Sequence, residues 1–274
     1  LGVSVSVDYI LEEIAVAEGS LSKKSEFLTK YCNIKQNSAL SWFRAEDVKR
    51  MFAEQKPIES LANHYALCGI DLSQTTDLTS ACFLVEDAGT IWVISHFWLP
   101  AEKIDEATQR DGVPYQAYIQ RGLLQPSGEN FIDYHDCYLC VTELIEKYRI
   151  LPLKCGYDRY SAQYLVQDLK SYGVHMDDVF QGENLYSVIQ ETQGLMEDGR
   201  IHIGDNDLLK IHLADAAQQM ESNTEQAHPR KKLVKISKTA HVDGVAALLD
   251  AMAMRQFKWD QMGRRLMNEN KRVR

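Results

Sequence analysis

The sequence lacks any long run of apolar residues. Its apolar stretches all fall short of the roughly 20 residues that a transmembrane helix needs, and no secretory signal peptide opens the chain. Apolar residues make up 45% of the chain and charged residues 25%, as in ordinary globular proteins. We therefore expect a soluble protein with no membrane partner.

Two motifs that would reveal a familiar active site are also absent. No Gly-x-x-x-x-Gly-Lys-Ser/Thr loop occurs, so the chain contains no Walker-type ATP site of its own. No nucleophile-elbow motif occurs either. The six cysteines, at positions 32, 68, 82, 137, 140 and 155, are scattered, and several lie in apolar runs. They predict reduced, buried thiols and not a disulfide framework.

Positive charge is scarce over the whole chain but is concentrated locally. The formal net charge of −9 argues against nucleic-acid binding by the molecule as a whole, because phosphate binding requires a positive surface. One segment nevertheless gathers five basic residues: Arg230, Lys231, Lys232, Lys235 and Lys238. A second basic stretch runs from Arg255 to Arg274. Either cluster taken alone is equally compatible with solvated surface charge.

The most informative stretch is residues 65–81. An apolar run of strand length ends at Asp71, a short polar turn follows, and a second strand is predicted over residues 81–85. Residues 91–98 predict a third strand. The first run is almost entirely apolar, as expected for a strand that is covered on both faces. A carboxylate at the end of such a strand requires a cation or hydrogen-bond donors nearby.

Later strands are predicted to alternate with helices. Residues 153–158 predict a strand that ends in Asp158, and residues 176–181 a further strand. Residues 224–228 and 232–237 predict a hairpin. Helices are expected over residues 3–18, 25–31, 45–54, 100–110, 113–121, 134–148, 161–172, 185–198, 207–222 and 241–257. Three antiparallel strands followed by helix-joined strands predict an α/β protein with a mixed, ribonuclease H-like sheet flanked by helices, a pattern that actin-like ATPases share.

Three aspartates are predicted to meet at one edge of this sheet. Asp71 and Asp158 end central strands, and sites in open α/β sheets form at the carboxyl ends of strands. Asp243 begins the last helix, whose N-terminus is expected at the same edge. Three carboxylates form an oxygen-rich pocket for Mg²⁺ or Mn²⁺, and a pair of such ions supports phosphodiester hydrolysis. In the structural alternative, Asp71 caps the turn and Asp243 caps the helix.

Three other residues are weaker candidates for the same site. Asp77 begins the second strand and is either a turn residue or a partner of the metal ligands. Asp250 lies two turns after Asp243, so that it either reaches the site or faces solvent. His241 either assists proton transfer or is an ordinary surface histidine at a helix end.

Several short motifs resemble a known family. They are Gly69-Ile70-Asp71-Leu72-Ser73 with Thr76-Asp77-Leu78-Thr79, Gly156-Tyr157-Asp158-Arg159-Tyr160, and His241-Val242-Asp243-Gly244-Val245. In order and spacing they resemble the nuclease domain of the large terminase subunits of tailed bacteriophages. The resemblance extends to residues 25–33 and 181–201, and so covers nearly the whole chain.

The resemblance implies a ribonuclease H-like nuclease that cuts concatemeric double-stranded DNA during viral packaging, with Asp71, Asp158 and Asp243 as its catalytic metal ligands. It also implies a fragment of a longer protein. Residues 1–60 would then be a helical leader from an ATPase domain, residues 61–260 the nuclease domain and residues 261–274 a basic tail. The implied partners are DNA, a small terminase subunit and the portal protein, in the cytoplasm of an infected bacterium. We further expect the basic segment before Asp243 to grip the duplex backbone without reading sequence.

Three rival functions stay open on the sequence alone. An actin-like nucleotide-binding protein or sugar kinase also places a phosphate loop after a Gly-Ile-Asp strand, but residues 72–80 contain no glycine to allow close approach of a phosphate. A catalytically silent docking module would hold DNA or a partner without cutting. The third rival is another ribonuclease H-like enzyme, such as a junction resolvase or a transposase.

Overall fold

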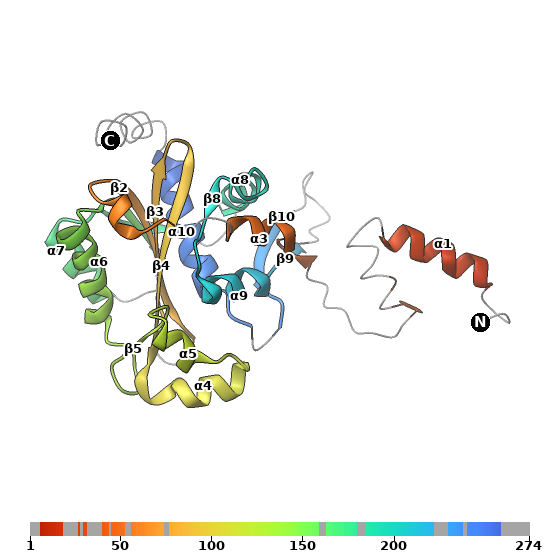
Figure 1. Ribbon diagram of the computed structural model, residues 1–274, viewed down its shortest axis with the longest axis horizontal. Helices are drawn as coiled ribbons and strands as arrows, with labels where there is room; N and C mark the ends of the chain where they lie inside the picture. Colours follow the sequence, from red (N-terminus) through yellow and green to blue (C-terminus); the bar gives the residue numbers. More distant parts are fainter. Residues whose placement is uncertain are drawn as a thin grey trace.

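The fold is known from a computed structural model of the chain (Figure 1). It describes residues 6–18, 27, 30–31, 40–43, 45–52, 56–73, 77–158, 163–179, 185–221, 230–237 and 240–258. The strands are β1 (Leu40–Ser41), β2 (Tyr65–Asp71), β3 (Thr79–Asp87), β4 (Thr90–Pro100), β5 (Gln125–Ser127), β6 (Leu151–Asp158), β7 (Met176–Val179), β8 (Ile201–His202), β9 (Ala216–Glu221) and β10 (Arg230–Lys235). The α-helices are α1 (Val7–Glu18), α3 (Ala45–Met51), α4 (Ile104–Asp111), α5 (Tyr115–Gln120), α6 (Tyr134–Tyr148), α7 (Gln163–Tyr172), α8 (Leu185–Glu197), α9 (Asp207–Asp215) and α10 (Asp243–Lys258), and two short 3₁₀ turns span Ile58–Leu61 and Ala101–Lys103.

The central sheet has the predicted mixed topology. Within the described part of the chain its strands follow the order β5-β4-β3-β2-β6-β7, with β8 beside β4. β2, β3 and β4 form an antiparallel meander, whereas β6 joins β2, and β7 joins β6, in parallel. The expected ribonuclease H-like sheet is thereby confirmed. The carboxyl ends of β2 and β6 lie at the same edge because the two strands run in the same direction.

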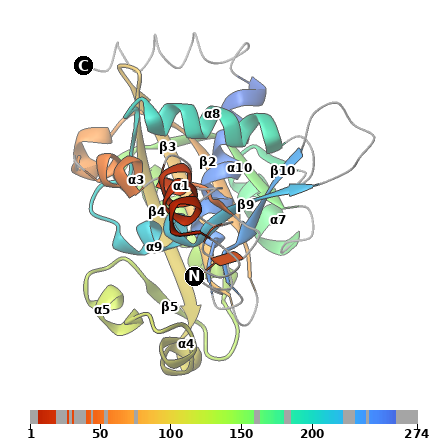
Figure 2. The same cartoon turned by 90° about the vertical axis from the view of Figure 1, so that its right-hand side faces the viewer.

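Helices cover both faces of this sheet (Figures 1 and 2). α6 and α7 pack on one face, and α10 lies against the other face beside α8 and α9. Because successive side chains of a strand point to opposite faces, β2 directs Cys68 and Ile70 toward α6 and directs Leu67 and Gly69 toward α10. Every second residue of β2 and β6 therefore faces α10.

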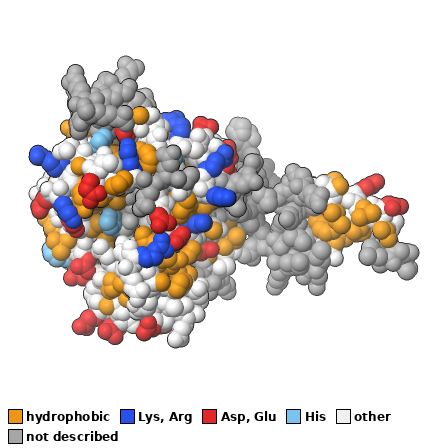
Figure 3. Space-filling view, viewed as in Figure 1, with side chains coloured by type: hydrophobic (Ala, Val, Ile, Leu, Met, Phe, Trp, Pro, Cys, Tyr) orange, Lys and Arg blue, Asp and Glu red, His pale blue; other side chains and the backbone are white. Residues whose placement is uncertain are grey.

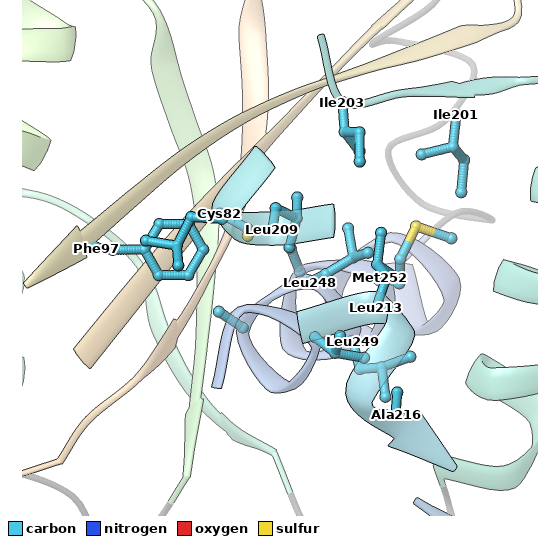
Figure 4. Packing of buried hydrophobic residues seen from close by; sticks show 14 of the residues in the cluster. Cys82, Phe97, Ile201, Ile203, Leu209, Leu213, Ala216, Leu248, Leu249 and Met252 are labelled. Atoms are coloured by element: carbon cyan, nitrogen blue, oxygen red, sulfur yellow. The ribbon is translucent and has the colours of Figure 1, made fainter. Parts of the chain in front are cut away.

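α10 is the central helix of the fold. Leu248, Leu249 and Met252 pack against Leu209 and Leu213 of α9 in the close view of Figure 4. The helix is apolar on nearly all sides, as its run of alanine, leucine and methionine requires for a helix that is surrounded by protein. It contacts β2, β3 and β6 along its length. The position of α10 consequently fixes every side chain that it brings to the sheet.

Two glycines allow α10 to approach the sheet closely. Gly69 on β2 and Gly156 on β6 are neighbours in the parallel ladder. A Cβ atom at Gly69 would lie 2.1 Å from the carbonyl oxygen of Ala247, and one at Gly156 would lie 2.7 Å from the carbonyl oxygen of Asp250. Both oxygens belong to the backbone of α10, so a larger residue at either position would push the helix away. These glycines set the distance between α10 and the strand ends.

The segment after α9 differs from the expectation. The sequence predicts a helix over residues 207–222, but α9 ends at Asp215 and Ala216–Glu221 form β9. The prediction is wrong because β9 pairs with both β1 and β10, and this non-local pairing outweighs the local helix propensity of alanine, glutamine and methionine. The predicted hairpin is displaced for the same reason: β10 pairs with β9, and residues 222–229 lie outside the described residues.

The N-terminal region is described only in part. α1 confirms the helix predicted over residues 3–18, whereas most of the helix predicted over residues 25–31 lies outside the described residues. Trp42, Val48 and Met51 are buried in the cluster on the α10 side of the sheet. The domain boundary at residue 60 stays a prediction, and the tail at residues 261–274 is outside the described residues. Among the helices that are described, none has the length and hydrophobicity to cross a bilayer.

Candidate functional site

Asp71 and Asp158 project from adjacent strand ends toward α10. Each lies two residues after a glycine that contacts α10, so the period of two places both carboxylates on the face that this helix covers. The register pairs Ile70 with Tyr157, which makes Asp71 and Asp158 neighbours at the edge of the sheet. The parallel pairing of β2 and β6 thus brings these two acids to one edge.

Asp243 reaches the same edge from the start of α10. Ser80, the partner of Asp71 in the β2–β3 ladder, donates a hydrogen bond of 2.7 Å from its Oγ to the carbonyl oxygen of Asp243. The side chain of Asp243 is 8% exposed. The first turn of α10 is capped by other groups, because Gly244 N–H donates to Nδ1 of His212 at 2.9 Å and the next two N–H groups donate to Val242. The Asp243 carboxylate is thus not needed to cap the helix.

Among the described residues, the bonds across the turn after Asp71 do not involve its carboxylate. Ser73 N–H donates to Thr79 Oγ1 at 3.0 Å, and the Thr79 hydroxyl donates to the Ser73 carbonyl oxygen at 3.0 Å. The Tyr134 hydroxyl donates to the same carbonyl oxygen at 3.1 Å. These bonds hold the described part of the turn, so a purely structural capping role for Asp71 is not needed.

Mutual repulsion among the acids shows in the pKa of Asp71. Burial raises this pKa well above its ordinary value, and the negative charges of Asp243, Asp158 and Asp77 raise it further. Lys235 opposes the effect. Burial likewise disfavours the ionised form of Asp243, but the close contact with His241 and the positive charge of Lys235 outweigh burial, and the pKa of Asp243 lies below its usual range. The site therefore concentrates carboxylates that need a compensating cation.

His241 is buried and links several of these acids. Its ring is 6% exposed, which excludes the surface-histidine interpretation. Nδ1 lies 3.4 Å from Asp243 Oδ2 and 3.7 Å from Asp77 Oδ1. Burial lowers the pKa of His241, but contacts with the carboxylates of Asp243 and Asp111 outweigh burial and raise it. Asp77 also forms an ion pair with Lys235 at 3.3 Å, so it lies beside His241 and Lys235.

Asp250 is fully buried beneath the other acids. The open question of whether it reaches the site or faces solvent is settled in favour of the interior, since the residue is 0% exposed. Burial raises its pKa well above the ordinary value, and the charges of Asp71 and Asp158 raise it further. Asp250 is therefore protonated in the folded protein over a pH range in which the unfolded chain ionises it.

Asp250→Asn is expected to lose less folding stability than the parent as the pH rises. Between the unfolded and the raised folded pKa, ionisation favours the unfolded chain by up to about 1.4 kcal/mol per pH unit, and the amide titrates in neither state. Urea unfolding without divalent metal, from about pH 4 to about pH 7, measures the difference. Asp168→Asn, at an exposed position, is the control. Parallel pH profiles for parent and Asp250→Asn would contradict the assignment.

Sequence reasoning missed a second group of residues around His241. Asp111, at the end of α4, lies with Oδ2 2.9 Å from His241 Nε2 and is bonded to Arg110 and Tyr115. Burial lowers the pKa of His212, the residue that caps α10, to about 4, so this ring is neutral. No sequence signal connects these residues to Asp243, because they are distant along the chain and carry no motif. The only local sign is the Gly-Val-Pro turn that follows Asp111.

The acids lie at one edge of the sheet, but the described side chains do not form a complete metal-binding group. Among the residues that the structure describes, no three His, Cys, Asp or Glu side chains are grouped as a finished metal site. The donors nevertheless fit a hard divalent cation: all three predicted ligands offer carboxylate oxygens, and burial together with repulsion raises the pKa of Asp71, a penalty that a cation would relieve. Asp71, Asp158 and Asp243 are the residues that would hold Mg²⁺ or Mn²⁺.

The predicted DNA-binding residues are described only in part. The side chains of Arg230, Lys231 and Lys232 and the whole of Lys238 lie outside the described residues. Lys235, at the end of β10, forms its ion pair with Asp77 and so brings the β9–β10 hairpin beside the acids. On the face drawn in Figure 3, acidic and basic side chains of the described residues are intermingled. Lys235 is thus a local positive charge next to an acidic site.

Comparisons with known proteins identify relatives. Residues 1–258 match the family "Terminase large subunit, endonuclease domain". The large terminase subunit of Enterobacteria phage HK97 is 26% identical over 215 residues, which are 77% of this chain and 41% of that protein. Protein YmfN of Escherichia coli strain K12 is 21% identical over 264 residues, which are 92% of this chain and 56% of that protein. The chain thus spans less than two thirds of the length of either relative.

Solved structures show the same fold. The crystal structure of the HK97 bacteriophage large terminase is similar with a TM-score of 0.66 at 20% identity, over 93% of this chain and 52% of that one. The large terminase nuclease of thermophilic phage G20c is similar with a TM-score of 0.50 at 13% identity, over 81% of this chain and 98% of that one. Since the family match covers nearly the whole sequence, the chain belongs to the family of terminase large subunit endonuclease domains.

Proposed function

We propose that this chain is a divalent-metal-dependent endodeoxyribonuclease that cleaves concatemeric double-stranded DNA for a viral packaging motor. The observation that carries the proposal is the meeting of Asp71, Asp158 and Asp243 at one edge of the sheet, from two strand ends and a helix start. Family membership favours a packaging nuclease over a junction resolvase or a transposase with a similar sheet. By the same family membership, the proposed partners are a small terminase subunit and the portal protein in the host cytoplasm.

Each acid has a distinct part in the proposed reaction. Asp71 and Asp158 would hold the metal ions from the sheet, and Asp243 would hold them from α10, whose position the two glycines fix. Such ions would supply Lewis-acid chemistry for phosphodiester hydrolysis, by lowering the pKa of a bound water and stabilising the leaving oxygen. His241 and Asp77 orient the ligands from behind, and Lys235 offers positive charge to the DNA backbone.

Digestion of a supercoiled plasmid tests the proposal. We expect nicked and linear products with Mn²⁺ or Mg²⁺, and none with a chelator in their place. Unbranched duplex should be cut as readily as a four-way junction, which separates a packaging nuclease from a resolvase. Binding of ATP by the same protein, measured by calorimetry, together with an intact plasmid, would instead support the actin-like alternative. An intact plasmid without ATP binding would support a silent docking module.

Removing positive charge from residues 230–238 is expected to weaken DNA binding uniformly across sequences. Substituting glutamine for Arg230, Lys231, Lys232, Lys235 and Lys238 should lower the affinity and reduce the slope of log K against log salt by about one for each phosphate that is no longer neutralised. Titration of a labelled duplex at several salt concentrations, in chelator to prevent cutting, measures both. Lys147→Gln is the matched control, because Lys147 is an exposed lysine at the far end of α6. An unchanged affinity and salt slope would show that other residues bind the DNA backbone.

A further inference from the structure

The carboxylate of Asp111 is buried and firmly held. Asp111 is the last residue of α4, and its side chain is only 1% exposed. Arg110 donates to it twice, from Nε to Oδ1 at 2.6 Å and from Nη2 to Oδ2 at 2.9 Å, and the Tyr115 hydroxyl donates to Oδ2 at 3.0 Å. Gly112, with φ of 68°, ends the helix immediately afterward in a left-handed conformation. Charge-assisted bonds of this kind fix both the position and the direction of a carboxylate.

The imidazole ring of His241 connects this carboxylate with the acid site. Asp111 Oδ2 lies 2.9 Å from Nε2 of His241, and the opposite ring nitrogen, Nδ1, lies 3.4 Å from Oδ2 of Asp243. The backbone of His241 is anchored as well, because its N–H donates to Asp215 Oδ2 at 3.1 Å. The imidazole ring is therefore held between two carboxylates, one that is fixed from α4 and one that belongs to the site.

The arrangement has the form of an outer ligand shell. In metalloproteins, a group that contacts a ligand from behind fixes its orientation, and loss of such a group weakens metal binding or activity by about 10–100-fold. Asp111 contacts Nε2 of His241, whereas Asp243 lies beside Nδ1 of the same ring. His241 therefore stands between the two carboxylates. The effect of Asp111 on a bound cation would accordingly pass through this ring.

We propose that Asp111 is a positioning residue which, through His241, orients the Asp243 carboxylate for a divalent cation. This inference rests on the proposed function of Asp71, Asp158 and Asp243 as metal ligands. It assigns a role to α4, which follows β4 and stands at the acid edge of the sheet in Figure 1. Arg110 and Tyr115 serve the same purpose one step further out, by holding Asp111 in place.

Direct measurement of Mn²⁺ binding by electron paramagnetic resonance tests the inference without relying on cleavage. Asp111→Asn is expected to bind Mn²⁺ about 10–100-fold more weakly than the parent, with a change in the ring ¹⁵N chemical shifts of His241 in the metal-free protein. Arg110→Gln, at a partly exposed side chain, is expected to show a smaller loss in the same direction. Asp105→Asn, on the exposed side of the same helix, should match the parent.

The outcomes separate this inference from the proposed function. If Asp243→Asn loses Mn²⁺ binding while Asp111→Asn and Arg110→Gln bind like the parent, the positioning role is wrong and the metal site stands. If the parent binds no Mn²⁺, or Asp243→Asn binds it normally, the metal site itself is wrong and the role of Asp111 falls with it. Should Asp111→Asn fail to fold, as thermal unfolding would show, Arg110→Gln decides the question.

Discussion

Asparagine at position 71, 158 or 243 is expected to abolish metal-dependent plasmid cleavage. Each substitution removes a negative ligand oxygen while keeping the size of the side chain, and the loss should exceed the roughly 100-fold upper range for groups that only support a ligand. The reason is the convergence of these acids from β2, β6 and α10 on one edge. The rate of conversion of supercoiled plasmid in Mn²⁺ is the measurement.

The same variants should not unfold the protein. Because burial and neighbouring acids already raise the pKa of Asp71, Asp71→Asn removes a strained carboxylate and is expected to keep or increase stability without metal. The midpoint temperature of thermal unfolding should rise with Mn²⁺ for the parent but not for this variant, since a ligand stabilises only the state that binds it. Asp168→Asn, at an exposed position on α7, should cut and respond to Mn²⁺ like the parent. Full cleavage by any one of the variants at positions 71, 158 and 243 would show that this residue is not part of the proposed site.

Alanine at Gly69 is expected to destabilise the protein strongly, because the added methyl group would collide with the backbone of α10. The new Cβ would lie 2.1 Å from the carbonyl oxygen of Ala247 and 2.3 Å from the backbone nitrogen of Ala251. Neither atom can yield without moving α10 away from β2, and overpacking of this severity costs about 3 kcal/mol or more. Chemical denaturation measures the loss, and cleavage should fall as well because the displaced helix carries Asp243.

A matched glycine shows the opposite behaviour. Gly194 lies within α8, and apart from its chain neighbours and the backbone of its own helix no atom lies within 4 Å of the place where its Cβ would be. Gly194→Ala is therefore expected to stabilise the protein by up to about 1 kcal/mol, the difference in helix propensity between the two residues. If Gly69→Ala unfolded at the same denaturant concentration as Gly194→Ala, the close packing of α10 on the sheet would be wrong.

The strands and the central helix are predictable because their signals are local. The apolar run that ends in Asp71 forms a strand that is buried over residues 66–70, and the shorter run that ends in Asp158 forms a strand of which Cys155 and Gly156 are buried. Strand direction then brings the two acids to one edge by geometry alone. The start of the last helix at Asp243 is predictable for the same reason, because a long apolar run begins there.

The features that sequence reasoning missed depend on distant pairing. Residues 216–221 are good helix formers, and only their partners β1 and β10 make them a strand. Whether Asp250 is buried depends on whether α10 is covered on one side or on all sides, and the sequence of α10 does not determine this. Asp111 meets His241 only because α4 returns to the sheet edge. Local periodicity contains none of this information.

Anomalous X-ray scattering from Mn²⁺ in crystals of the protein is the most direct test of the shared acid site. We predict manganese peaks within coordination distance of carboxylate oxygens of Asp71, Asp158 and Asp243. Crystals of Asp71→Asn should show no such peaks. Manganese bound elsewhere, with these three side chains making no contact with it, would contradict the shared site.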